Sequence, residues 1–493
     1  MDRSVCETVG LSLPISFFLN FAAMRFKKID ETDLLFFCSV LDKRYVLLQE
    51  EHLARCSSDQ TEDLVFRPEL VLQPGTAEEI SSILKYCNEK LISVTPRGAG
   101  TGLSGGALPV FGGVSLDMKR LNKILTLDKR NFQVTAESGV ITQELQEFVR
   151  AHGLMYPPDP ASKGSCFIGG NVSENSGGPR AVKYGVVKDY VLNLEVVLPT
   201  GEIIWTGANV LKNATGYNLT QLMVGSEGTL GVITKIVLRL VPAVQHDLLM
   251  LVSFRSAEQA CEAVNAIFLA GFIPSALEFM ERDAIEWTMK YVQQSAVPLP
   301  DDIQAHLLIE VDGNNIEQLY AEIEAITNIT QQYDTGDILF ADSHEQKQML
   351  WNLRRKVGEA VKSNSIYKEE DTVVPRAELP KLLKTIKRIG KEYGFHSVCY
   401  GHAGDGNLHV NIVKQNMSDD DWKNKLPIGI RALFTEVVKM GGTISGEHGI
   451  GFVQKNYLDI AFNETQMRLM REIKKIFDPN GILNPGKIFP STP

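Results

Sequence analysis

Apolar and polar positions follow two different rhythms in the first quarter of the chain. Segments 69–73 and 92–96 are short apolar runs of the kind that form buried strands. Segment 76–90 between them instead repeats its apolar residues every three or four positions, at Ile80, Ile83, Leu84 and Cys87. Since that spacing is typical of a helix with one buried face, the pattern predicts a β-α-β unit that leads into a glycine-rich loop.

The strand pattern continues to about residue 242 and then starts again. Strand-like runs follow the loop at 114–117, 132–138, 192–199, 202–205 and 231–240. Later runs at 248–254, 275–280 and 306–311 alternate with helical segments that begin at Ser256, Asp283 and Ile316. Helices at 345–363 and 376–393 flank a short polar segment, and the tail is helical again. We expect an α+β chain with domains at 24–242 and 243–430 and a C-terminal segment at 431–493.

Composition narrows the class of protein. The 493 residues are 44% hydrophobic and 22% charged, which is typical of a globular chain of two or three domains. A net charge of −10 without a basic run argues against nucleic acid as a partner, and no apolar run reaches the length of a membrane span. The seven cysteines lack a C-x-x-C pair, so we expect reduced thiols in the cytoplasm. Residues 1–23 are expected to be a non-structural extension, with Met24 as the natural start.

The loop PRGAGTGLSGG contains the spacing G-x-G-x-x-G. In a nicotinamide-dinucleotide fingerprint a helix must follow, because the pyrophosphate sits on its N-terminal amides. Here Pro109 and the pair Gly112-Gly113 follow instead, and no acidic residue stands at the expected distance of about 20 positions. The loop is therefore predicted to hold an anion with its own amides, without a helix; the alternative is a flexible surface loop.

Two further glycine-rich stretches concentrate ionisable residues. GHAGDGNLHVN carries His402, His409 and Asn411, the last two on the same strand face, and GGTISGEHGIG carries Glu447 and His448. Two imidazoles and one carboxylate suit zinc, manganese or iron(II) with coordination positions left open for a substrate. His448 would then remain as a base. Taken singly, each histidine would more often be an ordinary loop residue.

Two cationic side chains complete the candidates. WNLRRKVGEA places Trp351, Arg354 and Gly358 along one helix face, so Arg354 can point into a cleft. Lys368 precedes an acidic run at 369–371. By default both cations would be solvated surface charges, and only a carboxylate ligand would give them a buried role.

Six stretches together resemble the FAD-linked D-2-hydroxy-acid dehydrogenases of the vanillyl-alcohol-oxidase superfamily. They occur in order from about residue 66 to 490 and are PRGAGTGLSGG, PPDPASKGSCFIGGNVSENSGGPRAVKYG, GSEGTLGVIT, GHAGDGNLHVN, SGEHGIG and DPNGILNPGKIF. The most similar branches are D-lactate dehydrogenase, the FAD subunit of glycolate oxidase and D-2-hydroxyglutarate dehydrogenase. The resemblance implies a two-part FAD-binding domain, a substrate-binding cap domain with a helix-covered antiparallel sheet, and a C-terminal segment that returns to the FAD-binding domain.

The resemblance also implies that the glycine loop holds FAD rather than a nicotinamide dinucleotide. The attachment would be non-covalent, because the loop carries Ala99 where covalent members often have a histidine. The implied FAD-binding residues are Arg97, Gly98, Ala99, Gly100, Thr101, Gly102, Ser104, Gly105, Pro158, Asp159, Gly169, Gly170, Asn171, Asn175, Ser176, Gly177, Gly178, Glu227, Gly228, Gly231, Ile233 and Asn484.

The implied metal ligands, with zinc favoured over manganese or iron, are His402, His409 and Glu447. The implied catalytic residues are His448, Arg354, Lys368 and Asn411. Arg354 would grip the substrate carboxylate and His448 would take the proton of the 2-hydroxyl group. Gly358 stands where the family has a threonine one helical turn after the arginine, which counts against D-2-hydroxyglutarate as the substrate.

The implied reaction turns a small D-2-hydroxy acid into a 2-oxo acid and passes a hydride to the flavin. Electrons would leave to a separate acceptor, which is a quinone, an electron-transfer flavoprotein, a cytochrome or oxygen. The oligomeric state stays open, a homodimer included, and the location would be cytoplasmic or peripheral to the inner membrane. The rival reading is an alkyl-ether-forming synthase of the same superfamily, which makes no net oxidation. Those members carry a histidine run where this chain has SGEH.

Overall fold

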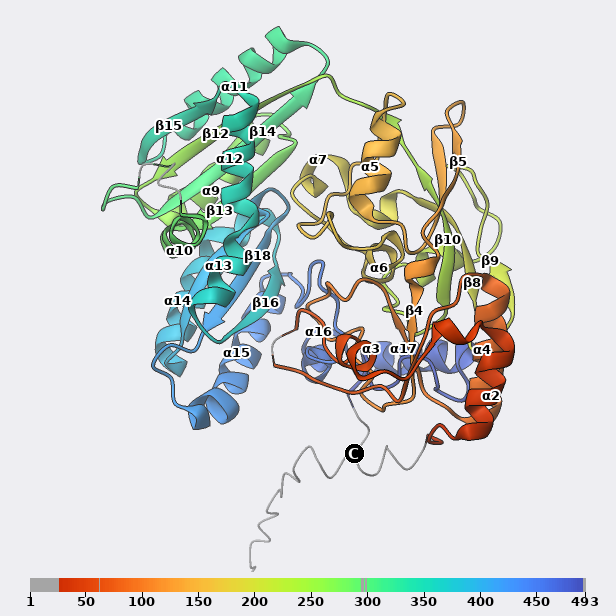
Figure 1. Ribbon diagram of the computed structural model, residues 1–493. Helices are drawn as coiled ribbons and strands as arrows, with labels where there is room; N and C mark the ends of the chain where they lie inside the picture. The colour runs from red at the N-terminus through yellow and green to blue at the C-terminus, as the bar shows by residue number, and fades with distance from the viewer. Residues whose placement is uncertain (1–25, 62, 294–296, 298, 491–493) are drawn as a thin grey trace, which may run out of the picture.

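The computed structural model describes residues 26–490 except 62, 294–296 and 298. Two bodies lie side by side (Figure 1). We refer to residues 26–242, with residues 452–490, as the first domain and to residues 246–451 as the second domain. The extension expected at 1–23 lies outside the described residues. Among the described helices, none has the length and apolar character needed to cross a bilayer.

The first domain is built on two sheets, which confirms the two-part α+β expectation. One has the order β1-β2-β4-β3, with β1 antiparallel to β2 and the other pairs parallel. The other is antiparallel in the order β5-β6-β10-β8-β9, and β7 pairs with β11. Its strands are β1 (Val46–Leu47), β2 (Leu70–Leu72), β3 (Val94–Arg97), β4 (Val114–Asp117), β5 (Ile124–Asp128), β6 (Gln133–Glu137), β7 (Leu154–Met155), β8 (Val191–Val197), β9 (Ile203–Trp205), β10 (Val232–Arg239) and β11 (Val241–Pro242). Its helices up to residue 242 are α2 (Glu31–Val40), α3 (Glu50–Arg55), α4 (Ala77–Lys90), α5 (Thr142–Arg150), α6 (Ile168–Glu174), α7 (Ala181–Tyr184) and α8 (Leu219–Met223).

The β-α-β unit forms as its pattern predicts. Helix α4 begins after Thr76, whose hydroxyl accepts the backbone N–H of Glu79, and it buries its apolar stripe in the core that also contains β2, β3 and β4. The glycine-rich loop connects β3 to the parallel neighbour β4 and contains no helix, which confirms that prediction. Gly100 and Gly105 have φ angles of +73° and +74°, a left-handed conformation that disfavours any side chain.

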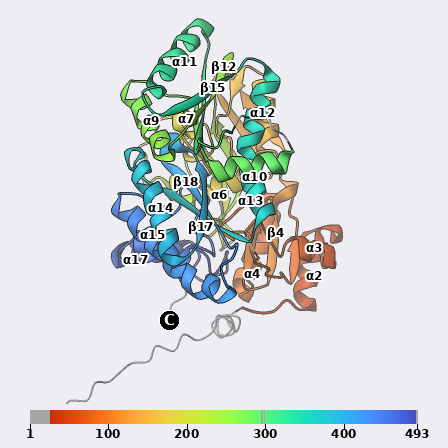
Figure 2. The same cartoon turned by 90° about the vertical axis from the view of Figure 1, so that its left-hand side faces the viewer.

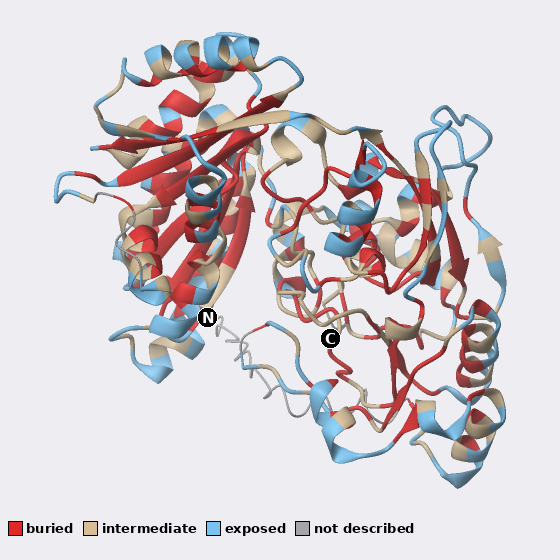
Figure 3. Ribbon diagram, turned by 45° about the horizontal axis from the view of Figure 1, so that its top comes forward, coloured by how far each residue is buried: buried red, intermediate tan, exposed pale blue. Residues whose placement is uncertain are grey.

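The second domain is one antiparallel sheet in the order β15-β12-β14-β13-β17-β18-β16, also as expected. Its strands are β12 (His246–Phe254), β13 (Ala276–Glu281), β14 (Ala305–Gly313), β15 (Thr335–Ala341), β16 (Tyr367–Val373), β17 (His396–Gly401) and β18 (Asn407–Val413). Its helices are α9 (Ala257–Leu269), α10 (Arg282–Val292), α11 (Ile316–Thr330), α12 (His344–Arg355), α13 (Val357–Asn364), α14 (Leu379–Tyr393) and α15 (Leu426–Lys439). Figure 2 shows α9, α14 and α15 on one side of the sheet and α10, α12 and α13 on the other. The sheet is therefore buried on both faces (Figure 3).

Two expectations for the second domain are wrong. The helix predicted at 345–363 is two helices, α12 and α13, because Lys356 between them leaves the helical conformation with φ −89° and ψ 2°. The polar segment after α13 is the edge strand β16 of the sheet. Its acidic run misled the pattern analysis because charged side chains usually mark a solvated segment, whereas Glu370 and Asp371 are buried here with polar partners.

The end of the chain returns to the first domain. Helices α16 (Leu458–Ala461) and α17 (Glu464–Phe477) lead to a segment in which Leu483 bridges to Val94 of β3. The backbone N–H of Asn484 donates to the carbonyl of Val94 at 2.7 Å. The C-terminal segment thus lies directly behind the glycine-rich loop.

Candidate active site

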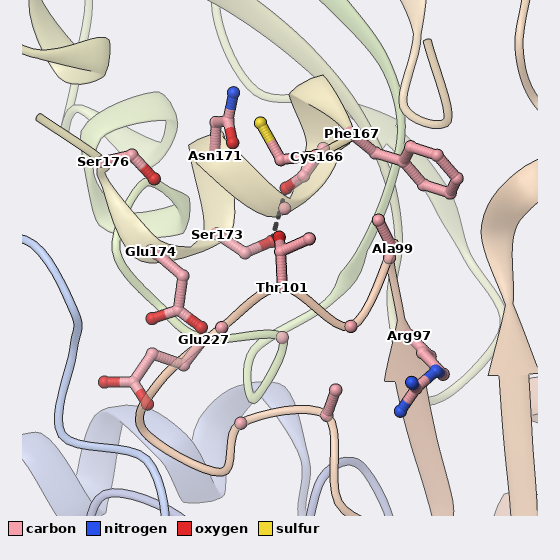
Figure 4. Close-up of a pocket in the computed structure, with 18 of the residues that line it drawn as sticks. Arg97, Ala99, Thr101, Cys166, Phe167, Asn171, Ser173, Glu174, Ser176 and Glu227 are labelled. Atoms are coloured by element: carbon pink, nitrogen blue, oxygen red, sulfur yellow. Dashed lines mark hydrogen bonds between the residues drawn. The ribbon is translucent and has the colours of Figure 1, made fainter. Parts of the chain in front are cut away.

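A cavity opens between the glycine-rich loop, helix α6 and the start of β10, and the loop with Glu447 and His448 closes one side of it. Figure 4 shows Asn171, Ser173 and Glu174 of α6 beside the glycine-rich loop. A Cβ atom added at Gly102 or Gly170 would meet no atom within 4 Å, so both glycines leave open space against the backbone. Such a cradle fits a large cofactor held by main-chain amides, as FAD would be.

The implied FAD-binding residues divide into two groups. Those that line the cavity are Arg97, Gly98, Ala99, Gly100, Thr101, Gly102, Gly169, Gly170, Asn171, Ser176, Glu227, Gly228, Gly231 and Ile233. Those outside its lining are Ser104, Gly105, Pro158, Asp159, Asn175, Gly177, Gly178 and Asn484. The lining also includes Cys166, Phe167, Ser173 and Glu174, which sequence reasoning missed.

Several residues of the second group hold the walls together. The side-chain amide of Asn484 donates to the carbonyl oxygens of Gly106 and Glu227, at 3.0 and 2.8 Å. Gly177 donates its backbone N–H to Glu447 Oε2 at 3.1 Å. These residues therefore support the walls of the cavity and the neighbouring group of ionisable residues.

Glu227 fastens the loop after His448 to the first domain. Its two carboxylate oxygens accept the backbone N–H groups of Ile450 and Gly451, at 2.8 and 2.6 Å. The residue itself has a left-handed backbone with φ +52°, an uncommon conformation outside glycine. This clamp brings the ionisable cluster of the second domain to the edge of the cradle.

The three expected metal ligands converge. His402 follows β17, His409 lies on β18 across a tight turn, and Glu447 reaches them from the loop after α15. Glu447 Oε1 lies 3.1 Å from His402 Nε2 and 3.5 Å from His409 Nε2. One atom of each residue falls within 4.8 Å of the others, close enough to share one ion.

The electrostatics of this group favour a bound cation. Burial disfavours the charged form of His402, but the carboxylates of Glu278 and Glu447 outweigh it and raise the pKa of His402 well above its usual value. Burial lowers the pKa of His409 to about 3, so its ring is neutral and keeps a lone pair for a metal. Burial would raise the pKa of Glu447, but His402 and His409 lower it to about 2. The donor set therefore fits a divalent metal ion.

Asp371 organises the loop that carries Glu447 and His448. Its Oδ2 atom accepts the backbone N–H groups of Gly446, Glu447 and His448 at 2.7, 2.7 and 3.0 Å, and the hydroxyl of Ser445 at 3.1 Å. Burial disfavours protonation of His448, yet Asp371 and Glu369 outweigh it and raise the pKa of His448. The imidazole is thereby a stronger proton acceptor than an isolated histidine.

Arg354 and Asn411 join the cluster, and Lys368 does not. Arg354 lies at the end of α12, only 6% exposed, and its Nε has no hydrogen-bond partner among the described residues. Asn411 is fully buried on β18, and its side-chain amide makes no hydrogen bond of normal geometry within the described chain. Buried polar atoms without partners at this position favour a polar ligand. Lys368 pairs with Ile412, so its side chain lies on one face of the sheet and those of His409 and Asn411 lie on the other.

Sequence reasoning missed the acidic residues behind the cluster, namely Glu278, Glu369 and Asp371. Glu278 is 0% exposed on β13, where ALEFM is otherwise apolar. A single carboxylate in a strand buried on both faces has to find a cationic or hydrogen-bonding partner, and this signal was present in the sequence.

The fold and the cavity define an FAD-dependent enzyme, and comparison with known proteins gives its family. Residues 68–207 match the family model of the FAD binding domain, and residues 244–488 match that of the C-terminal domain of FAD linked oxidases. The chain is 40% identical to D-lactate dehydrogenase of Anaerostipes hadrus, over 86% of this chain and 90% of that protein. It is 38% identical to glycolate oxidase subunit GlcD of Bacillus subtilis, over 88% and 91% of the two chains. The chain therefore belongs to the FAD-linked oxidase family.

A relative in rice also matches most of the chain, and solved structures support the fold. The probable mitochondrial D-2-hydroxyglutarate dehydrogenase of Oryza sativa is 34% identical over 94% of this chain and 83% of its own. The structure of p-cresol methylhydroxylase with substrate bound matches with a TM-score of 0.76 at 19% identity, over 97% of this chain and 98% of that one. An alkyldihydroxyacetonephosphate synthase matches with 0.73 at 19%, over 93% and 86%. At these identities the two structures show the fold alone.

Proposed function

We propose that the protein oxidises a D-2-hydroxy acid of the lactate, glycolate or hydroxyglutarate type to the 2-oxo acid. The observation that carries the proposal is the meeting of a buried arginine, a basic histidine and a two-histidine, one-carboxylate group at the edge of the FAD cradle. The names of the relatives supply the substrate class, since three of them are a D-lactate dehydrogenase, a glycolate oxidase subunit and a probable D-2-hydroxyglutarate dehydrogenase.

Each residue of the site would have a distinct role. Arg354 binds the substrate carboxylate, because its guanidinium is buried and its Nε–H has no partner within the described chain. His448 accepts the proton of the 2-hydroxyl group, and Asp371 fixes the loop from which it does so. Asn411 offers its fully buried side-chain amide to the same ligand. We assign no substrate contact to Lys368, because its side chain lies on the opposite face of the sheet from Asn411.

Two bound groups would complete the site. FAD, held non-covalently along the glycine-rich loop, would accept the hydride from C2 of the substrate. A divalent metal, most simply zinc, held by His402, His409 and Glu447, would lower the pKa of the substrate hydroxyl. The electrons would then pass to a separate acceptor such as a quinone, an electron-transfer flavoprotein, a cytochrome or oxygen. The six cysteines of the described part are free thiols, which supports a cytoplasmic location.

An anaerobic spectral titration tests the proposal. The purified protein is mixed in turn with D-lactate, L-lactate, glycolate, D-2-hydroxyglutarate and D-malate, and the oxidised-flavin band near about 450 nm is followed. We expect glycolate or one of the D-acids to bleach the band, L-lactate to leave it, and a chelator to prevent the bleaching. An oxidised flavin that none of the acids reduces would reject the function and favour the alkyl-ether-forming alternative.

A further inference from the structure

One carboxylate lies behind both halves of the proposed site. Glu278 on β13 is fully buried, and its Oε2 lies 2.6 Å from Arg354 Nη2. Both of its oxygens lie 2.9 Å from His402 Nδ1. The strand register explains the position, because Phe279 pairs with Gly401 and Glu278 therefore stands beside the residue that follows β17. Glu278 thus connects Arg354, near the end of α12, to His402, which follows β17.

The contact with His402 sets which ring nitrogen is free. Because Nδ1 is held against Glu278, Nε2 is the ring nitrogen that faces Glu447, 3.1 Å away, and the one that would ligate a metal ion. A carboxylate behind a ligating histidine fixes its tautomer and its ring orientation in this way. The contact with Arg354 has a parallel effect, since an ion pair in a dry environment holds the guanidinium in one place.

We propose that Glu278 is a positioning residue that couples Arg354 to His402, so that the carboxylate-binding side chain and the metal-binding side chain are held as one unit. The inference rests on the proposed function for the role of Arg354, and on the side-chain contacts alone for the coupling. Glu278 itself touches neither the substrate nor the metal. Its removal therefore loosens two sites at once, and a change at Arg354 reaches His402 through it.

The test is a double-mutant cycle read out as zinc affinity. The dissociation constant of Zn²⁺ is measured by competition with a chromogenic chelator for the FAD-loaded wild type, Glu278→Gln, Arg354→Lys and the double variant. We expect Glu278→Gln to weaken zinc binding by about 10- to 100-fold. Arg354→Lys keeps the positive charge but loses the guanidinium geometry. It should weaken zinc binding several-fold when Glu278 is present and have no further effect in the Glu278→Gln variant.

The matched control is Glu281→Gln on the same strand. Glu281 is ion-paired with Lys387 at 2.7 Å and accepts the backbone N–H of Cys399, on the opposite face of the sheet. We expect this variant to bind zinc as the wild type does. If Glu278→Gln does not fold, Glu278→Asp replaces it, because it keeps the charge but is too short to reach both partners.

Two results of the zinc measurements would overturn the proposal. Zinc affinity within twofold of the wild type in Glu278→Gln overturns the positioning role. Additive effects of the two substitutions overturn the coupling, since Arg354 would then act independently of Glu278. The measurement uses no hydroxy acid, so a protein that oxidises none of them would still report on Glu278.

Discussion

The imidazole rings of His409 and His448 lie almost parallel, with centroids 5.1 Å apart and planes inclined by 10°. One ring belongs to the candidate metal group and the other is the candidate base. Because the two rings come from different segments, β18 and the loop after α15, their stacking fixes the distance between the metal position and the base. Proton removal and polarisation of the hydroxyl can thereby act on the same small ligand.

Replacing His448 by alanine tests its role as the base. We expect the rate of flavin reduction to fall by about 10² to 10⁴-fold while the flavin stays bound, because proton transfer from a positioned base contributes that much. Since the pKa of His448 is raised, kcat/KM of the wild type should increase with pH through a pKa above 6.5, and the variant should lose this dependence. His396→Ala is the control, as that ring lies at the surface, with its Nε2 in a 2.8 Å hydrogen bond with Asp283. Near-normal turnover in His448→Ala would remove the assignment.

Replacing Arg354 by lysine separates geometry from charge. Lysine keeps the positive charge but cannot make the bidentate contact, so we expect kcat/KM to fall by roughly 10- to 100-fold, mainly through KM. Steady-state kinetics with the acid that reduces the flavin measure this loss. Arg355→Lys is the matched control one position further on the same helix, where the guanidinium packs 5.0 Å from the Trp351 ring. Equal kinetics for both variants would show that Arg354 does not bind the substrate.

Most of the fold could be predicted from periodicity, and the reasons for the failures are physical. The helix α4 and the strands β2, β3, β12, β13 and β14 bury regular apolar patterns, which sequence alone reveals. Strand β16 was missed because its acidic side chains are buried against hydrogen-bond partners from distant segments, such as Gln454, whose amide donates to Glu370. The break at Lys356 was missed because the residue has no helix-breaking chemistry of its own.

The candidate site was predictable where glycine-rich motifs carry it. His402, His409, Glu447 and His448 stand in such motifs, and the structure brings them together. The acids that support them were not predictable from spacing, because Asp371 contacts Gly446 across 75 positions of the chain and Glu278 contacts His402 across 124. The face on which Lys368 emerges depends on strand pairing, which the sequence pattern had not revealed.

Replacing Gly177 by alanine tests the contact between the two domains. An added Cβ at Gly177 would stand 2.7 Å from Glu447 Oε2, so the carboxylate has to move. A displacement of about 1 Å at a reacting centre costs about 10²-fold in rate, and we expect a loss of that order together with weaker zinc binding. Flavin reduction and zinc competition measure the two effects. Gly313→Ala, whose Cβ would make an ordinary 3.4 Å contact with Leu319, should change neither. Unchanged zinc affinity in Gly177→Ala would contradict this account.

Glu370 gives the protein a pH-dependent stability that does not involve the active site. It lies on the face of β16 opposite Asp371, and burial raises the pKa of Glu370 to about 7, although the Gln454 amide donates to it at 2.6 Å. The folded protein therefore holds this proton more tightly than the unfolded chain does. The free energy of unfolding should fall as pH rises from about 4.5 to 7, by an amount on the order of 3 kcal/mol.

Glu370→Gln removes the ionisable group but keeps the shape. We expect the variant and the wild type to be equally stable near pH 4.5, and the variant to gain relative to the wild type up to pH 7 and to keep the gain above it. Thermal or urea unfolding at several pH values measures the difference, with Glu324→Gln, exposed on α11, as the control. A stability difference that does not change with pH would mean that Glu370 stays ionised in the folded protein, and that the buried face of β16 accommodates its charge.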